Sequence, residues 1–149
     1  MTSEPQSGSL KDPSSLVLRK TIDFDKMLVF SGYPETNSIH TNREMARSLG
    51  LPDAIAQGLH TYAFMCEWLI KYFGIDWFNG GELDVNFLSV VVPGDVVFVK
   101  AALVEAERRE EGTSLRLAIW VETTDGTKVV AGHATAAITG ADTNGTRDD

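Results

Sequence analysis

The sequence predicts an α+β fold in which one long helix packs against the concave face of a curved antiparallel sheet. Two observations predict it. Apolar residues recur at helical spacing over residues 59–73, and from residue 82 onward segments rich in Val, Ile, Phe and Thr alternate with turn signals. Because the apolar surface of the helix is wide, a second layer must cover it, and the sheet is the layer available.

The composition is that of one globular domain. The chain has 149 residues, of which 43% are hydrophobic and 23% are charged, and a single domain typically has about 100–200 residues. The net charge of −8 argues against nucleic-acid and anionic-membrane partners, which require a cationic surface. No apolar stretch has the length of a signal sequence or a membrane span, so we expect a cytoplasmic protein.

Both ends of the chain are predicted to be flexible tails. Residues 1–15 and 139–149 are rich in Ser, Thr, Gly, Pro and Asp and contain almost nothing to bury. We therefore expect one folded domain over residues 16–138, with no linker inside it.

The first half of this domain is predicted to be a short strand followed by two short helices. The strand covers 16–19, and the spacing of apolar residues predicts the first helix over 24–30. The second helix, 41–49, begins with a capping box at Thr41 and ends before Gly50.

The long helix has the clearest pattern in the chain. Gly58 lies at its start and Gly74 at its end. Its apolar positions are Leu59, Tyr62, Ala63, Cys66, Leu69, Ile70 and Phe73. The single cysteine, Cys66, is therefore interpreted as a small buried hydrophobe. With three His in the chain and no ligand spacing among them, no metal site is expected.

Long strands are predicted after the helix, over 83–92, 96–106, 113–123 and 128–138. Turn residues separate them, and Asp125-Gly126 is a strong signal for a tight hairpin. Successive antiparallel connections predict a meander. A short first strand and four long strands around one helix form the arrangement known as the hot-dog fold.

The densest group of chemically useful side chains lies between the two short helices. Glu35, Asn37 and His40 place a carboxylate, an amide and an imidazole close together in the sequence. Burial and neighbouring charge can tune a carboxylate and an imidazole toward neutral pH, so Glu35 and His40 form a candidate acid–base pair. The alternative interpretation is a solvated loop whose Asn, Ser and Pro residues only shape turns.

A second candidate site is the start of the long helix, around Gln57, Gly58 and His60. Backbone amides in the first turn lack helical acceptors, and the helix dipole favours negative charge there. Gly58 would let a ligand carbonyl approach, which makes this end a candidate oxyanion site. The alternatives are an ordinary helix start at Gly58 and a packing role for His60.

Three segments resemble the motifs of the MaoC-like hydratases and dehydratases, a hot-dog family. Glu35-Thr36-Asn37-Ser38-Ile39-His40 resembles the family's Asp-x-Asn-Pro-Ile/Leu-His motif. Ile55-Ala56-Gln57-Gly58-Leu59 resembles the segment Ile-Ala-His/Pro-Gly-Met/Leu that starts the hot-dog helix. Further on, Asn86 to Asp95 resembles Arg-Phe-x-x-Pro-Val-x-x-Gly-Asp. The matches keep their order and spacing over roughly residues 22–138.

The resemblance implies an enzyme that adds water to a 2-enoyl thioester and yields an (R)-3-hydroxyacyl thioester. By matched position, Glu35 would activate the water, and His40 would hold that water and deliver the proton. The Gly58 amide would bind the thioester oxygen. The resemblance also implies that Asn37 steadies the pair within its loop. Gln57 and His60, which lie beside Gly58, are further candidate substrate-binding residues. No cofactor is implied beyond the coenzyme A or acyl carrier protein that carries the acyl group.

Two other functions stay open. A hot-dog thioesterase would use a carboxylate to direct water at the thioester carbonyl. A non-catalytic partner subunit of a heteromeric hydratase is favoured by differences from the family motif, since Glu35 replaces Asp, Ser38 replaces Pro, and Tyr33-Pro34 is an insertion. An unpaired edge strand predicts a homodimer or a higher homo-oligomer. The resemblance further implies that residues 86–92 line the neighbour's pocket.

Overall fold

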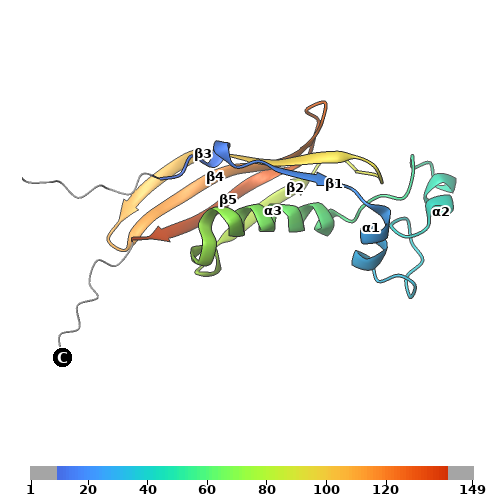
Figure 1. Ribbon diagram of the computed structural model, residues 1–149, viewed down its shortest axis with the longest axis horizontal. Coiled ribbons are helices and arrows are strands. Elements are labelled where there is room, and N and C mark those ends of the chain that lie inside the picture. The colour runs from blue at the N-terminus through green and yellow to red at the C-terminus, as the bar shows by residue number, and fades with distance from the viewer. Residues whose placement is uncertain (1–9, 141–149) are drawn as a thin grey trace, which may run out of the picture.

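The computed structural model describes residues 10–140, and the parts of the predicted tails at 1–9 and 141–149 lie outside the described residues. Figure 1 shows a sheet that curves over one long helix, with α1 and α2 beyond the start of that helix. The elements in chain order are η1 (Pro13–Ser15), β1 (Leu18–Thr21), α1 (Phe24–Phe30), α2 (Arg43–Ser48), α3 (Gly58–Phe73), η2 (Gly74–Phe78), β2 (Glu82–Phe87), β3 (Val96–Arg109), β4 (Gly112–Thr123) and β5 (Lys128–Thr139). Within the segment predicted as an N-terminal tail, η1 is a 3₁₀ turn whose Pro13 is buried.

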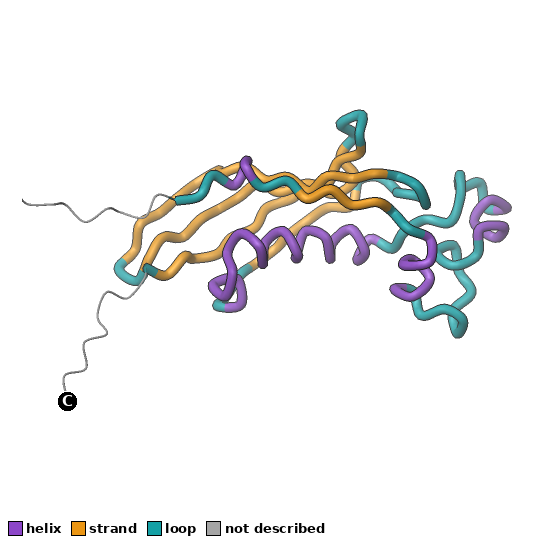
Figure 2. Tube along the Cα trace, in the orientation of Figure 1, coloured by secondary structure: helices purple, strands orange, loops and turns teal. Residues whose placement is uncertain are grey.

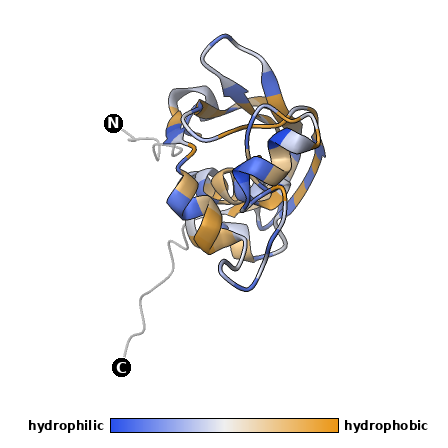
Figure 3. Ribbon diagram, turned by 90° about the vertical axis from the view of Figure 1, so that its right-hand side faces the viewer, coloured by the Kyte–Doolittle hydropathy of each residue, from blue (hydrophilic) through white to orange (hydrophobic). Residues whose placement is uncertain are grey.

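The five strands form one open antiparallel sheet in the order β1-β3-β4-β5-β2, and α3 lies along its concave face (Figures 1 and 2). Figure 3 looks along the molecule from the end that carries α1 and α2, and the sheet curves around the helix. This arrangement confirms the predicted α+β fold. The helix ends where its sequence predicts, because Gly74 adopts a φ of 60° that favours glycine and stops the helix.

The core lies between α3 and the central strands. Met65, Trp68 and Leu69 on α3 are completely buried. Trp68 keeps its polar atom paired, because Nε1 donates to the carbonyl oxygen of Leu16 at 2.8 Å. Along β4 every second residue is buried, and these residues are Leu115, Leu117, Ile119 and Val121. Within residues 10–140, every helix falls short of the length or the hydropathy that a membrane crossing requires.

The predicted meander is correct for β3, β4 and β5 and wrong for β2. Instead of forming a hairpin with β3, β2 pairs with β5, where Val85 lies opposite Gly132. A Cβ on Gly132 would lie 1.9 Å from the carbonyl oxygen of Asp84, so the close approach of β2 requires glycine there. Residues 88–95 therefore form a crossing connection rather than a tight turn.

Several predicted boundaries also change. The strand predicted over 83–92 ends at Phe87, and the one predicted over 96–106 continues to Arg109. The first strand begins at Leu18 rather than at residue 16. The N-cap of α2 is Asn42 rather than Thr41, because the Asn42 side chain accepts from the Met45 amide at 2.9 Å. The Thr41 hydroxyl instead binds inside the preceding loop, where it accepts from the Ser38 amide. Both residues are competent caps, and the loop fold decides between them.

Candidate active site

A cavity of about 390 Å³ lies where the start of α3, the end of β2 and the segment before α2 meet. Most of its wall is apolar. Its lining includes His40, Gly58, Leu59 and Phe87. Both of the regions that the sequence marked as candidate sites thus contribute to one cavity.

His40 is held in this cavity wall by a single ring nitrogen. Its Nδ1 lies 2.8 Å from the carbonyl oxygen of Ile55. Because a carbonyl oxygen can only accept, Nδ1 carries the hydrogen, and Nε2 of the neutral ring is left as the acceptor. Within residues 10–140 no group binds Nε2, so this nitrogen is available to a ligand.

The backbone around His40 fixes the ring further. The Ile55 amide donates to the carbonyl oxygen of Ile39 at 3.0 Å, directly beside the His40 contact. The amide of His40 itself donates to the Ser38 hydroxyl at 3.2 Å. Ser38, which replaces the Pro of the family motif, therefore still shapes the loop. The segments at 38–40 and at 55 thus hold each other through a short ladder of hydrogen bonds.

The start of α3 presents free donors to the same cavity. The amides of Gly58 and Leu59 make no hydrogen bond within the described part of the chain, as expected in the first turn of a helix. Ile55, which would be the helical acceptor of Leu59, gives its carbonyl oxygen to His40 instead. One cavity is therefore lined by an imidazole and by two residues whose amides are unpaired within residues 10–140, at the helix end where the dipole favours negative charge.

Phe87 covers the glycine at this helix start. A Cβ on Gly58 would lie 2.8 Å from Cε1 of the Phe87 ring. The sequence predicts that Gly58 leaves room for a ligand carbonyl, and the structure fills that room with a side chain. Phe87 is 54% exposed, so its ring has open space into which it can turn. Gly58 and Phe87 are far apart in the sequence, so no local sequence pattern predicts their contact.

Glu35 does not join His40 in this structure. Its carboxylate is exposed, lies outside the cavity lining, and makes no hydrogen bond or ion pair with any other residue between 10 and 140. Its amide donates to the carbonyl oxygen of Gly32 at 3.1 Å, which closes the turn built on the Tyr33-Pro34 insertion. The carboxylate of the candidate pair therefore stays a prediction that rests on its position in the motif.

Asn37 and Gln57 support the site without lining it. Asn37 Oδ1 accepts from Asn42 Nδ2 at 3.0 Å, so Asn37 steadies the cap of α2. Gln57 Nε2 donates to the hydroxyl of Ser31 at 3.1 Å and so ties the start of α3 to the end of α1. In both cases the amide group contacts the scaffold.

His60 lies apart from His40. It is only 7% exposed and stacks on Phe30 at 4.8 Å between ring centroids, with Phe64 edge-on at 5.1 Å. It lines a separate hollow with residues of α1, among them Lys26. Burial, and after it the charge of Lys26, lowers the pKa of His60 below its usual value. The contacts of His60 are those of a packing residue.

The chain also matches a known protein family. Residues 9–124 match the family model described as MaoC like domain, so the chain belongs to the MaoC-like dehydratase family. No curated protein matches the chain.

Solved structures of hot-dog proteins share the fold at low identity. The (R)-hydratase from A. caviae involved in PHA biosynthesis is 19% identical, with a TM-score of 0.71 over 89% of this chain and 99% of that chain. R-hydratase PhaJ1 from Pseudomonas aeruginosa is 20% identical, with a TM-score of 0.66 over 83% and 79% of the two chains. The HadBC (3R-hydroxyacyl-ACP dehydratase) complex from Mycobacterium tuberculosis is 13% identical, with a TM-score of 0.61 over 86% and 98%. These likenesses confirm the hot-dog fold.

Proposed function

We propose that this protein is a hydro-lyase that reversibly hydrates a trans-2-enoyl thioester to an (R)-3-hydroxyacyl thioester in the cytoplasm. The observation that carries the proposal is one cavity lined both by His40, whose Nε2 has no partner among residues 10–140, and by Gly58 and Leu59, whose amides make no hydrogen bond with those residues. Membership of the MaoC-like family supports it. The thioester would arrive on coenzyme A or on an acyl carrier protein.

The chemistry follows from where these groups lie. The thioester oxygen accepts from the Gly58 and Leu59 amides, which stabilise the enolate charge that develops when water oxygen bonds to C3. The electron pair of the C2–C3 double bond moves toward the thioester, and C2 then takes a proton. His40 Nε2 hydrogen-bonds the water and serves as the proton carrier between water and C2. One molecule of water is added across the double bond, and the reverse sequence removes it.

Glu35 is the proposed partner of His40 in activating the water. It lies on the loop that leads directly to His40, and it occupies the acidic position of the family motif. Because the Glu35 carboxylate is exposed and contacts no side chain among residues 10–140, binding a water would break no hydrogen bond or ion pair in that part of the chain.

We also propose that two copies of this chain form a homodimer. The sheet is open, so β2 presents an unpaired edge. Large apolar side chains are exposed on α3 and at the end of β2, namely Leu59, Ile70, Phe87, Leu88 and Val90. Pairing of two β2 edges would cover these side chains. Sedimentation velocity at micromolar protein concentration tests this proposal, and a monomer would contradict it.

A partner-subunit role is the second candidate. The absence of Glu35 from the cavity lining among the described residues favours it, and the HadBC structure is itself a complex. Such a protein would form a stable but inactive dimer whose activity requires a second chain.

The test is hydration of crotonyl-CoA and of a longer trans-2-enoyl-CoA by the purified protein. Loss of enoyl absorbance with formation of the (R)-3-hydroxyacyl product supports the proposal. Release of free thiol without hydration supports a thioesterase instead. No turnover of either substrate, together with activity after addition of a second chain, supports the partner subunit.

A further inference from the structure

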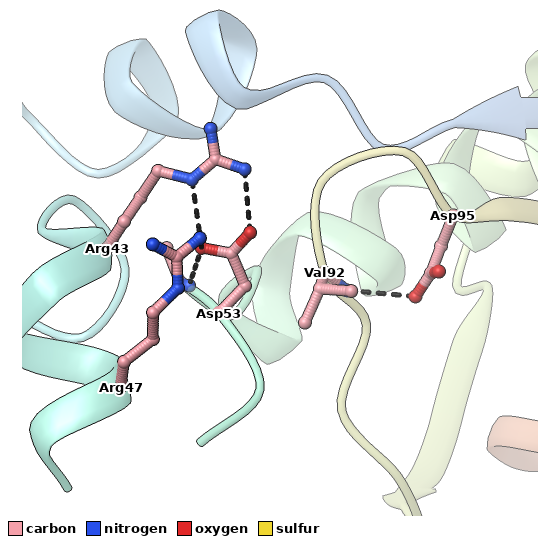
Figure 4. Close-up of polar contacts among 6 residues, drawn as sticks. Arg43, Arg47, Asp53, Val92 and Asp95 are labelled. Atoms are coloured by element: carbon pink, nitrogen blue, oxygen red, sulfur yellow. Dashed lines mark hydrogen bonds and ion pairs between the residues drawn. The ribbon is translucent and has the colours of Figure 1, made fainter. Parts of the chain in front are cut away.

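Asp53 joins the two segments that hold His40. Its carboxylate receives a two-point contact from Arg43, with Nε at 2.9 Å from Oδ1 and Nη2 at 2.6 Å from Oδ2. Arg47 adds a contact at 3.3 Å from Nη2 to Oδ1. Figure 4 shows both guanidinium groups pointing from α2 toward Asp53. Hydrogen bonds from Arg43 hold the pKa of the Asp53 carboxyl well below its usual range.

The ion pair between Asp53 and Arg43 is important for the site because of where its two residues lie in the chain. Arg43 opens α2 shortly after His40, and Asp53 lies two residues before Ile55, whose carbonyl oxygen receives His40 Nδ1. The Asp53 carboxylate also accepts from the amide of Ala54 at 2.8 Å, which directs the backbone toward Ile55. The ion pair and the His40–Ile55 hydrogen bond are thus two contacts between the same pair of segments.

The far side of the Ile55 segment is held by backbone contacts. Ala56 donates to the carbonyl oxygen of Val91 at 2.9 Å. The turn that follows Val91 is closed by Asp95, whose carboxylate accepts from the Val92 amide at 3.0 Å (Figure 4). On the side of α2, the charged contact to Asp53 comes from Arg43 and Arg47.

We propose that Asp53 and Arg43 are positioning residues for His40. Through the Ile55 carbonyl they keep the proton on Nδ1 and direct Nε2 into the cavity. Which nitrogen of a histidine carries the proton is set by the hydrogen bond of the other nitrogen, and small displacements of a catalytic group have large kinetic effects. The kinetic consequence rests on the proposed hydratase function, whereas the effect on the ring proton does not.

The test compares Asp53→Asn and Arg43→Lys with the wild type. Asp53→Asn keeps the shape of the side chain and removes its negative charge. Arg43→Lys keeps the positive charge and removes the planar guanidinium group that makes the two-point contact. Glu122→Gln is the matched control, because Glu122 pairs with Lys100 on the sheet, away from the cavity. The first readout is the ¹⁵N spectrum of the histidine rings, with the His40 signals assigned from a His40→Asn variant.

In Asp53→Asn we expect the His40 signals to move from a pure Nδ1–H form toward a mixture of the two tautomers. Arg43→Lys should show a smaller change in the same direction, and Glu122→Gln none. On an enoyl-CoA substrate, Asp53→Asn should lower kcat by about 10–100-fold, with KM changed much less and the acid limb of the pH–rate profile moved.

Unchanged His40 ring signals in both folded variants would overturn the positioning role. Should Asp53→Asn fail to fold, Arg43→Lys alone decides the question. An inactive wild type whose His40 tautomer still responds to Asp53 would refute the hydratase function and leave the positioning role standing. An active wild type whose His40 tautomer does not respond to Asp53 would refute the positioning role and leave the hydratase function standing.

Discussion

The imidazole Nδ1 of His40 and the carbonyl oxygen of Ile55 lie 2.8 Å apart, although 15 positions separate the two residues in the chain. This contact assigns the ring proton to Nδ1 and leaves Nε2 of the neutral ring as an acceptor. Ile55 also lies two residues before Gln57, the N-cap of α3. One backbone carbonyl therefore links His40 to the segment that leads into the long helix.

His40→Asn should abolish most hydration and leave the fold intact. Asparagine retains a donor for the Ile55 carbonyl but cannot carry a proton at neutral pH. We expect kcat/KM on crotonyl-CoA to fall by about 10²–10⁴-fold. The free energy of unfolding in urea should change by less than about 1 kcal/mol. His40→Ala removes the donor as well and should cost about 1–3 kcal/mol of stability. Full activity of His40→Asn would contradict the assigned role.

Glu35→Gln tests the carboxylate separately from the loop. Because the Glu35 side chain makes no contact within residues 10–140, we expect the unfolding free energy to stay within about 0.5 kcal/mol of the wild type. If Glu35 activates the water, kcat should fall by about 10²–10⁴-fold. Glu111→Gln, another exposed carboxylate, is the control for loss of one charge. Equal activity of the two variants would remove Glu35 from the mechanism.

Gly58→Ala should be destabilising only while Phe87 is present. The added Cβ would lie 2.8 Å from Phe87 Cε1, so the ring must turn away. Because the Phe87 ring is half exposed and can turn, we expect a loss of at most about 1 kcal/mol in the wild-type background, at the low end of the cost of overpacking. In a Phe87→Ala background the loss should disappear. A double-mutant cycle measured by urea unfolding provides the coupling, and an equal cost in both backgrounds would show that the two residues act independently.

His60 should make the protein less stable as the solution is acidified. Its pKa is lowered in the folded state by burial and by Lys26, so the unfolded chain binds a proton that the folded chain does not. The free energy of unfolding should therefore fall as pH drops below about 6.5, by at most about 1.4 kcal/mol per pH unit for this one group. His60→Phe should flatten this part of the profile and keep the aromatic stack. His133→Gln, at an exposed strand position, should leave the profile unchanged.

The sequence predicts the helices and strands of this fold better than it predicts which of them pack or pair with one another. The long helix is recognisable because its apolar spacing and its flanking glycines are local features. The pairing of β2 with β5 is not local, and its only trace in the sequence is Gly132 in the middle of a strand. The cap of α2 fell on Asn42 rather than Thr41 because a loop contact that no helix pattern encodes engages the Thr41 hydroxyl.

For the site, too, the sequence predicts local features and does not predict long-range contacts. Its residue types were recognisable from motif spacing, and His40 and Gly58 do meet in one cavity. The covering of Gly58 by Phe87 and the ion pair of Asp53 with Arg43 depend on chain crossings that spacing does not encode. His60 has the same residue type as His40 and lies near the same helix end, yet the rings of Phe30 and Phe64 enclose it.

The Ile55 carbonyl has a consequence for how this chain can change over time. An α3 that began two residues earlier would make the Ile55 carbonyl oxygen the helical acceptor of the Leu59 amide. Lengthening the helix would therefore reorient the oxygen that holds His40 and pair an amide that has no partner among residues 10–140. Gln57 keeps an extended backbone with φ −61° and ψ 145°, so the helix begins only after it. We expect a substitution at 55–57 that only improves helical propensity to lower the proposed hydratase activity, although it changes no residue proposed to contact the substrate.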